Sequence, residues 1–559
     1  MVRRVLSLLT ADVSSVHAAA YLLAVSALCS QLLALIRDRL LAHNFGAGSE
    51  LDVYYAAFRV QDFIYFAVAS LVSLAVLIPI LVEKTELGKK ETKEFLNSVF
   101  SSFFVATVFL GGLAIFFAPK LITILFPGLI GIGFDKDLLF LTRVLLLSPL
   151  ILGLSNLLGS VTQAYKKFFI YALSPLLYNV GIIIGIIFFY PPFGLAGLAY
   201  GVILGALLHL AIQVPFIVSE GLLPRFTFRW DTRDLKRLLL LSVPRTFTLS
   251  LNHIAILVLV GLASLMKSGS ISVLSFSFNL QSVSVSIIGA SYSVAAFPIL
   301  ARHYLKKEEK ASNDHFTLAR KHISRLTIPA LVTFIVLRAQ IVRVVLGSGS
   351  FSWEDTRLTA ASLALLSLSI VAQCVSLLFV RAFYAAGDSR KPLIISVISS
   401  LSIVASAYVF YSLYSTSYVF RYFLETLLRV SDVPGTEVLI LPLAYSVGAF
   451  INVVLFWIFF HRYLSRFSLP LGRTALHSAS ASILMGVVMY KSLDILSRIF
   501  DLNTFIGIFL QGALSGMLGL LFLIAILAIL KNEEFFDIVH SLHHKMFKKV
   551  EVVQTDSEV

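Results

Sequence analysis

Long apolar runs separated by short polar turns make up almost the whole chain. Each run reaches the roughly 20 residues that a helix needs to cross a bilayer. Fourteen such runs begin near residues 17, 52, 97, 138, 168, 194, 237, 270, 317, 356, 390, 438, 473 and 503. The pattern therefore predicts an all-α polytopic membrane protein with about 14 transmembrane helices.

The turns between these runs alternate in charge. Every second turn is basic, as at Lys89, Lys166, Arg233, Lys306, Arg390 and Arg466. The turns between them, at 46–50, 191–194 and 347–355, are short, rich in glycine and poor in lysine and arginine. Because basic loops stay in the cytoplasm, the alternation predicts a multi-pass membrane protein with both termini on the cytoplasmic side.

Two short similarities relate the first part of the chain to the second. Pro79 and Pro298 lie in similar apolar segments 219 residues apart, and Ala164 and Ala382 end similar runs 218 residues apart. The agreement predicts two six-helix lobes that are parallel repeats, because six spans return the chain to the same side. The predicted organisation is an N-terminal lobe at 1–236, a C-terminal lobe at 237–465, a helix pair at 466–531 and a cytoplasmic tail at 532–559.

Composition excludes several classes of protein. Hydrophobic residues make up 58% of the 559 and charged residues 14%, which excludes a soluble globular domain. The net charge of +14 is explained by the basic cytoplasmic loops, so nucleic acid is not a predicted partner. Cys29 and Cys374 lie in apolar runs, and the sequence has neither a nucleotide-binding Walker loop nor zinc-ligand spacing. No metal, cofactor or ATPase activity is predicted.

Charged residues inside apolar runs are the candidate functional groups, because burying a charge in lipid is costly. Arg37 and Asp38 are adjacent in the first run, where they either bind an anion in a wet cavity or form a static ion pair. Arg39 is predicted to extend towards the outer interface. In the second run, Arg59 and Asp62 have the spacing of a local helical pair.

Several uncharged polar residues also interrupt the apolar runs. Asn252, Asn279 and Gln281 either line a cleft or bond across helices. His209 and His253 are interpreted as packing residues. The longest external connection, at 415–437, is interpreted as an amphipathic surface helix.

A family resemblance follows from motifs in the first and tenth spans. Arg37-Asp38, then Phe45-Gly-Ala-Gly48 and Asp52 with Tyr54-Tyr55, resembles the first hairpin of the MurJ/MviN lipid II flippases. Arg381-Ala-Phe-Tyr-Ala-Ala-Gly-Asp388 is similar to that family's motif after the tenth span. The resemblance implies the multidrug/oligosaccharidyl-lipid/polysaccharide exporter fold, with a central cationic cavity and an added helix pair that forms a groove for a lipid tail.

The family's activity and site residues are implied in the same way. Its members move a polyprenyl-pyrophosphate-linked peptidoglycan precursor from the inner to the outer leaflet by alternating access, without enzymatic chemistry. By resemblance, Arg37 would contact the pyrophosphate, Asp38 would orient Arg37, and Asp52 would be the acidic residue that begins the second span. Arg59 is a further cationic candidate.

This chain departs from the family pattern at three arginine positions. Gln31, Tyr65 and Asn279 stand where the resemblance leads us to expect arginine. Gln31 and Asn279 are therefore predicted to bind substrate without a charge. The chain is expected to be a divergent member that holds its headgroup with fewer charges or carries a less anionic substrate.

Lipid II transport is the leading functional hypothesis. Export of another polysaccharide, lipid-linked oligosaccharide or drug is an alternative within the superfamily. A membrane-embedded glycosyltransferase using Asp52 is an alternative from another class, which the short external turns disfavour. Asp38, Asp52 and Asp62 are candidate partners of a driving proton or sodium ion, and the membrane potential is a third means of driving transport. The expected partners are the lipid-linked precursor, membrane lipids and other cell-wall synthesis proteins.

Overall fold

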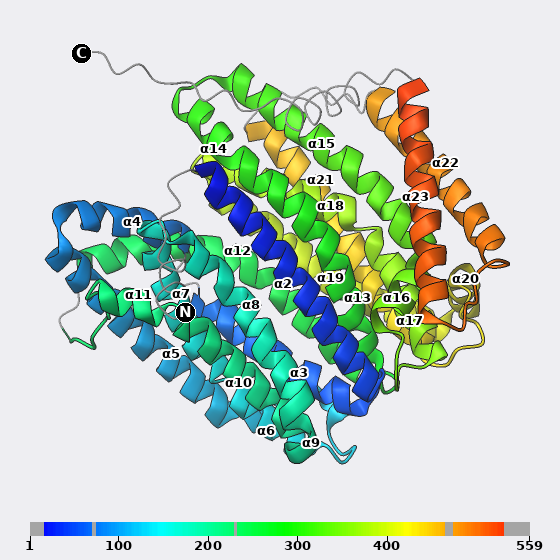
Figure 1. Ribbon diagram of the computed structural model, residues 1–559, viewed down its shortest axis with the longest axis horizontal. Helices are drawn as coiled ribbons and strands as arrows, with labels where there is room; N and C mark the ends of the chain where they lie inside the picture. The colour runs from blue at the N-terminus through cyan, green and yellow to red at the C-terminus, as the bar shows by residue number, and fades with distance from the viewer. Residues whose placement is uncertain (1–15, 70–73, 229–231, 464–472, 530–559) are drawn as a thin grey trace, which may run out of the picture.

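The protein is a helical bundle, and none of its described residues lies in a strand. The computed structural model describes residues 16–69, 74–228, 232–463 and 473–529, and the predicted cytoplasmic tail at 532–559 lies outside them. We call residues 16–228 the first half and residues 232–463 the second half. Figure 1 shows the first half in blue and teal beside the second half in green and yellow.

The helices of the first half are α2 (Val16–Phe45), α3 (Ser49–Ala69), α4 (Leu74–Leu87), α5 (Lys89–Leu125), the short 3-10 helix η2 (Pro127–Leu129), α6 (Asp135–Leu145), α7 (Ser148–Ala164), α8 (Phe168–Ile184), the π-helix η3 (Gly185–Phe189), α9 (Tyr190–Phe193), α10 (Leu195–Ala211) and α11 (Val214–Ser219).

The helices of the second half are α12 (Thr232–Ser264), α13 (Ser270–Ser284), the π-helix η4 (Val285–Ala290), α14 (Ser291–Leu305), α15 (Glu309–Val336), α16 (Arg338–Leu346), α17 (Trp353–Ser367), α18 (Ile370–Ala385), α19 (Arg390–Thr416), α20 (Tyr418–Leu428), the 3-10 helix η5 (Thr436–Leu439) and α21 (Ile440–Tyr463). Two more helices follow, α22 (Arg473–Leu496) and α23 (Phe505–Ile529).

The prediction of an all-α membrane protein is confirmed. Among the described residues, ten helices are long and apolar enough to cross a bilayer, or twelve if the bent pairs α15–α16 and α17–α18 each count as one span. The two other predicted spans lie on α3, which carries Asp52, Arg59 and Asp62, and on α12, whose apolar segment is only Ser250–Ser264. The total of 14 stays a prediction.

The buried cores show how the two halves meet. One large apolar cluster draws residues from both halves next to the turns at Gly46, Gly194, Gly269 and Gly349. At the opposite end, next to the basic turns, there are two separate cores. One combines residues of the first half with Leu235 and Leu238 at the start of α12, and the other runs from Leu300 to Phe460. We call these the Gly46 end and the basic end. The halves therefore share a core at the Gly46 end, whereas at the basic end the start of α12 packs with the first half and the remaining core of the second half is separate.

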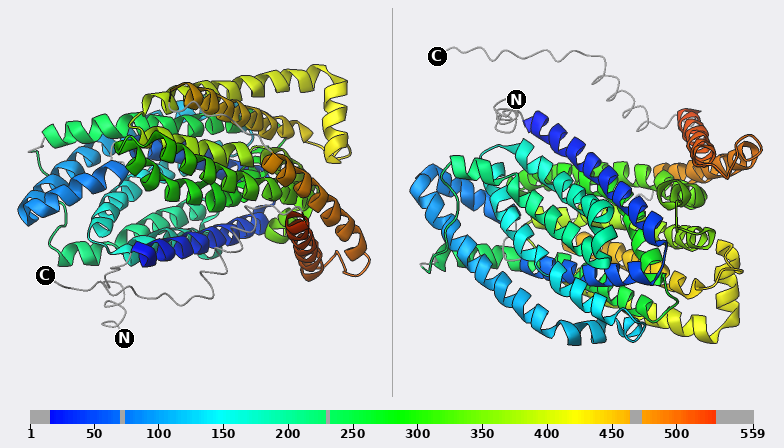
Figure 2. Two further views of the ribbon diagram at one scale, coloured as in Figure 1. Left: turned by 90° about the horizontal axis from the view of Figure 1, so that it is seen from above. Right: turned by 60° about the horizontal axis from the view of Figure 1, so that its bottom comes forward.

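The figures agree with this arrangement. Helices α3 and α13 pack against each other at the Gly46 end, and Figure 1 draws most of the first half at the lower left and most of the second half at the upper right. Helix α2 crosses one face of the bundle diagonally in Figure 1, and in the left view of Figure 2 it lies along the lower edge of the bundle. One end of α2 is held by α8, where Ser26 Oγ donates to the carbonyl oxygen of Ala172.

The last two helices form a separate pair beside the second half. Ala481, Met485 and Met489 of α22 pack against Leu523 and Leu527 of α23 in a small core of their own. The pair lies against α15 and α16, at the right of Figure 1.

The predicted surface helix in the external connection is confirmed as α20. Its Glu425 carboxylate is buried and accepts hydrogen bonds from Thr436 Oγ1 (2.6 Å), Arg421 Nε (3.0 Å) and the Tyr414 hydroxyl (3.0 Å). Burial alone would raise the pKa of Glu425, but these hydrogen bonds outweigh it and lower the pKa below its usual value. The opposite face of α20 is apolar and exposed, with Tyr418, Val419, Tyr422, Phe423 and Leu427.

Glycines allow α8 and α10 to pack backbone against backbone. A Cβ atom on Gly181 would lie 2.2 Å from the Cα of Gly205, and a Cβ on Gly201 would lie 2.5 Å from the Cα of Gly185. Small residues four apart are the usual means of close helix packing in lipid, where apolar surface alone gives little attraction between helices.

We predict that Gly201→Ala destabilises the protein by about 1–3 kcal/mol, because the new methyl group forces α8 and α10 apart. Thermal unfolding in detergent measures the effect. Gly112→Ala is the matched control, since a Cβ there meets no heavy atom within 4 Å. Equal melting temperatures for the two variants would contradict the prediction.

Candidate functional site

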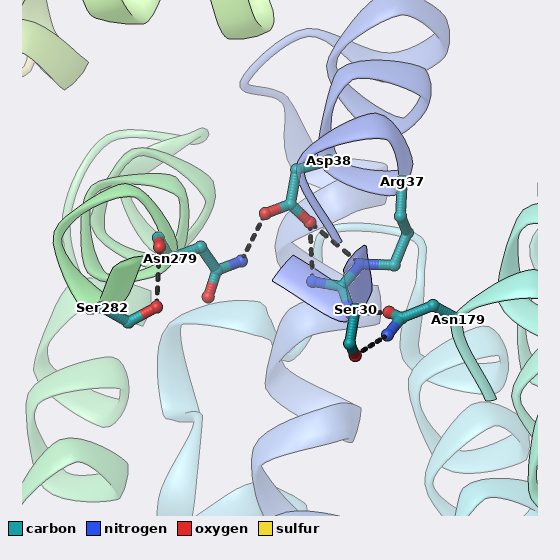
Figure 3. Close-up of polar contacts among 6 residues, drawn as sticks. All are labelled: Ser30, Arg37, Asp38, Asn179, Asn279 and Ser282. Carbon is teal, nitrogen blue, oxygen red and sulfur yellow. Dashed lines mark hydrogen bonds and ion pairs between the residues drawn. The ribbon is translucent and has the colours of Figure 1, made fainter. Parts of the chain in front are cut away.

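Arg37 and Asp38 form a largely buried ion pair about two turns before the end of α2. Asp38 Oδ1 accepts hydrogen bonds from Arg37 Nε (3.0 Å) and Nη2 (2.8 Å), and Asp38 Oδ2 accepts one from Asn279 Nδ2 (2.9 Å). The Asp38 side chain is 3% exposed and that of Arg37 is 18% exposed. Asp38 therefore joins the first half to α13 while it orients the guanidinium of Arg37 (Figure 3).

Helix α8 contacts the other side of this guanidinium. Arg37 Nη1 donates to Asn179 Oδ1 at 3.5 Å, and Asn179 Nδ2 donates to Ser30 Oγ at 3.2 Å. Figure 3 shows Arg37 between Asp38 and Asn179, with Asn279 on the far side of Asp38. The cluster thus takes its side chains from α2, α8 and α13.

A second ion pair lies on α3. Arg59 Nη1 and Asp62 Oδ2 are 3.5 Å apart, with 18% and 23% of their side chains exposed, so the predicted local pair is confirmed. One turn further along, Phe66 stacks on His253 of α12, with ring centroids 3.6 Å apart. Each arginine of the site therefore has a carboxylate beside it, and the four charges of Arg37, Asp38, Arg59 and Asp62 cancel.

Asp52 lies apart from these pairs, at the N-terminus of α13. Its carboxylate accepts hydrogen bonds from the backbone N–H of Gly269 (2.6 Å), the backbone N–H of Ser272 (2.7 Å) and the hydroxyl of Ser272 (2.6 Å). The first N–H groups of a helix have no partner within the helix and carry partial positive charge, so they suit a carboxylate. Asp52 therefore caps a helix of the other half while it is itself 3% exposed.

The backbone at Gly269 makes this contact possible. Gly269 has φ of +92°, and a Cβ atom there would lie 2.1 Å from the carbonyl oxygen of Ala47. Next to it, the hydroxyls of Ser49 and Ser268 are 2.7 Å apart, which adds a further bond between the halves. Asp52 and its neighbours thus close the Gly46 end.

Arg39 extends from α2 to the last turn of α16, which borders the turn at 347–355. Its Nη1 donates to the carbonyl oxygen of Val344 at 2.6 Å, and its guanidinium lies 5.0 Å from the ring centroid of Phe505. The extension of Arg39 towards the outer interface stays a prediction. Val344 belongs to the last turn of α16, where carbonyl groups lack helical partners and attract a cation. Arg39 therefore joins α2 to the second half and to α23.

The structure brings some of the predicted site residues together and leaves others apart. Arg37, Asp38 and Asn279 form one bonded cluster, and Arg59 and Asp62 form a pair on α3. Gln31 is half-buried on α2, six residues before Arg37, and makes none of the bonds of that cluster described above. Tyr65 accepts a hydrogen bond from Asn156 Nδ2 at 2.7 Å. Among the described residues, no group of three or more His, Cys, Asp or Glu side chains could hold a metal ion.

The remaining polar residues mostly bond across helices. Gln281 Nε2 donates to the Leu366 carbonyl oxygen and to Ser369 Oγ, both at 2.9 Å. His209 Nδ1 lies 2.6 Å from Ser155 Oγ and His253 stacks on an aromatic ring, as expected of packing residues.

The family profile for the lipid II flippase MurJ matches residues 41–511. The chain belongs to the MurJ family. The matched region covers α3 to α22 but begins after Arg37 and Asp38, so the resemblance at that pair rests on the sequence motif alone. This MurJ-family protein is a multi-pass membrane protein, and its family consists of transporters rather than enzymes.

Curated relatives agree with the profile. The chain is 30% identical to a probable lipid II flippase MurJ of Buchnera aphidicola subsp. Acyrthosiphon pisum over 385 residues, which cover 67% of this chain and 74% of the relative. It is 26% identical to a probable lipid II flippase MurJ of Haemophilus influenzae over 407 residues, which cover 67% of this chain and 77% of the relative.

Solved structures share the fold. A lipid II flippase MurJ in an inward closed conformation superposes with a TM-score of 0.69 at 23% identity, covering 94% of this chain and all of that one. An inward-facing multidrug resistance transporter of the MATE family, in the MOP superfamily, superposes with a TM-score of 0.63 at 16% identity, covering 78% of this chain and 94% of that one. The predicted exporter fold is therefore confirmed.

Sequence reasoning missed the partners of Asp52. The segment Lys267-Ser-Gly-Ser270 has the serine and glycine typical of a helix N-terminus, which was the available signal. Nothing in the sequence of α3 indicates that this N-terminus, 217 residues further along the chain, binds Asp52.

We predict that Asp52→Asn opens the Gly46 end of this MurJ-family protein. A carboxylate accepts these three hydrogen bonds more strongly than a neutral amide does. The fraction of molecules closed at the Gly46 end should therefore fall about tenfold or more. Spin labels at Asn44→Cys and Leu265→Cys, on opposite halves, measure the opening as a longer distance.

Ser270→Ala is the matched control, because its hydroxyl bonds to Lys267 in the same turn and not to Asp52. Ser272→Ala removes one of the three donors and should give a smaller opening. If the distances in Asp52→Asn match those of the unmodified chain, the cap does not hold the halves together.

Proposed function

We propose that this chain moves lipid II, a polyprenyl-pyrophosphate-linked peptidoglycan precursor, from the inner to the outer leaflet by alternating access. Family membership supports the substrate. The observation that carries the mechanism is the pair of separate cores at the basic end beside the shared core at the Gly46 end. A transporter that is closed on one side and able to part on the other has this arrangement.

The proposed orientation places the basic end in the cytoplasm and the Gly46 end outside, in the bacterial inner membrane. The basic turns at Lys89, Lys166 and Arg390 support it, because cytoplasmic loops carry the excess of positive charge. Both termini are then cytoplasmic, and the closed gate formed by Asp52 faces outwards. The two lobes at 1–236 and 237–465 are the proposed moving units, and 466–531 is the proposed groove for the lipid tail.

Arg37 is the proposed pyrophosphate ligand. Its guanidinium is partly exposed and is held in place by Asp38 and Asn179, and a planar guanidinium suits paired phosphate oxygens. Arg59 is the proposed second cation. Asn279 and Gln31 are proposed as uncharged contacts in place of the arginines that the family resemblance implies.

The proposed coupling uses the same carboxylates. Asp38 and Asp62 neutralise Arg37 and Arg59, so an anionic headgroup must compete with them, and a proton or sodium ion bound to either aspartate would favour the headgroup. A proton on Asp52 would weaken the cap on α13. The membrane potential acting on these charges is a further proposed driving force. Other cell-wall synthesis proteins and membrane lipids are the proposed partners.

Depletion in the native cell tests the function. Loss of the protein should reduce labelling of lipid II at the outer surface, because the precursor then stays in the inner leaflet. The control is depletion of an established flippase in the same assay. Unchanged surface labelling of lipid II in a cell without another flippase would refute the proposal.

Arg37→Ala should abolish transport while the protein still reaches the membrane and keeps its melting temperature. Arg37→Lys keeps the charge without the planar fork and should retain only part of the activity. Surface lipid II in a complemented depletion strain measures both variants. If Arg37→Ala instead unfolds the protein, the ion pair with Asp38 is structural.

A further inference from the structure

A cavity of about 240 Å³ lies in the second half among α12, α18, α19 and α21. None of its lining residues is aspartate, glutamate, lysine or arginine. The polar side chains on its wall include amides and hydroxyls, namely those of Asn252, Gln373, Ser376, Ser399, Tyr445 and Asn452. The cavity therefore carries uncharged polar groups on a largely apolar wall, unlike the arginine and aspartate pairs on α2 and α3.

The packing holds these polar groups in place. Tyr445 packs edge-on against Phe278, with ring centroids 4.9 Å apart, and its hydroxyl donates towards Asn252 Oδ1 and Gln373 Oε1, each at 3.5 Å. The hydroxyl of Ser376 is buried and has no hydrogen-bond partner among the described residues. A buried hydroxyl without a partner is costly, so a ligand that bonded to it would gain stability.

The cavity adjoins the charged site. Tyr445 on its wall belongs to the core that the halves share, and Phe456 belongs to the core of the second half alone, so the cavity lies where the halves begin to part. His253, also on the wall, stacks on Phe66 of α3, seven residues after Arg59. A headgroup whose phosphates meet Arg59 could therefore extend past His253 into the cavity.

We propose that this cavity binds an N-acetylated sugar ring of the transported headgroup. Amides and hydroxyls recognise hydroxyl and acetamido groups, whereas a charged group here would be buried without a counter-ion. The volume is below the roughly 300–1,000 Å³ of pockets for larger ligands, which fits one ring rather than a whole headgroup. The inference rests on the proposed function and adds an uncharged subsite that selects the glycan.

Binding of two lipids, one with the sugars and one without them, distinguishes the subsite from the phosphate site. The double variant Asn252→Ala/Asn452→Ala should bind lipid II about tenfold more weakly, since it removes amide hydrogen bonds, and should bind undecaprenyl pyrophosphate as well as the unmodified chain does. Dissociation constants in detergent measure both. Asn313→Ala, on α15 away from this cavity, is the matched control, and Arg37→Ala should weaken both lipids.

Two outcomes would overturn the subsite: unchanged lipid II binding in the double variant, or an equal loss for both lipids. If the unmodified chain binds neither lipid, the proposed function fails, and a separate measurement decides the subsite.

Asn452→Cys in a Cys29→Ala background is labelled with a maleimide. N-acetylglucosamine should slow the labelling and inorganic pyrophosphate should not. Labelling unaffected by the sugar refutes the inference.

Discussion

The contact between Asp52 and the N-terminus of α13 is the constraint on which the arrangement of the halves depends. A buried carboxylate in a membrane protein needs several donors, and the free N–H groups at a helix N-terminus supply them without a second charged side chain. Because those groups belong to the other half, the solvation of one aspartate requires the halves to touch at the Gly46 end. The shared core and the Ser49–Ser268 bond surround this contact.

The charges of the candidate site, unlike Asp52, are balanced by side chains of opposite charge. Arg37 and Arg59 each lie beside a carboxylate, so the four side chains together are neutral, which suits a low-dielectric environment. Anion binding then exchanges one partner for another rather than filling an open positive site. Gln31, Tyr65 and Asn279 stand where the family resemblance implies arginines. Contacts between the uncharged cavity and the rest of a headgroup would supply binding affinity in place of those arginines.

The helices and the charged candidates could be predicted from the sequence, because apolar length and the cost of a buried charge are local signals. Arg37 and Asp38 are neighbours on α2, and Arg59 and Asp62 are neighbours on α3, so their spacing already indicated an ion pair as one of two interpretations. The partners of Asp52 and Arg39 are helix termini more than 200 residues away, and no periodicity points to them. Asn279 stands out in the sequence as an absent arginine, but in the structure its amide completes the bonding of Asp38.

Helix α2 is fastened to a different half at each end. Ser26, on one side, bonds to α8, while Arg39, on the other, bonds to the end of α16 and lies over a ring of α23. A rod held in this way cannot follow both halves when they rotate. It must bend or slip at one fastening, and the Arg37–Asp38 pair lies between the two. A rotation of the halves would therefore strain the segment of α2 between Ser26 and Arg39, which contains Arg37 and Asp38.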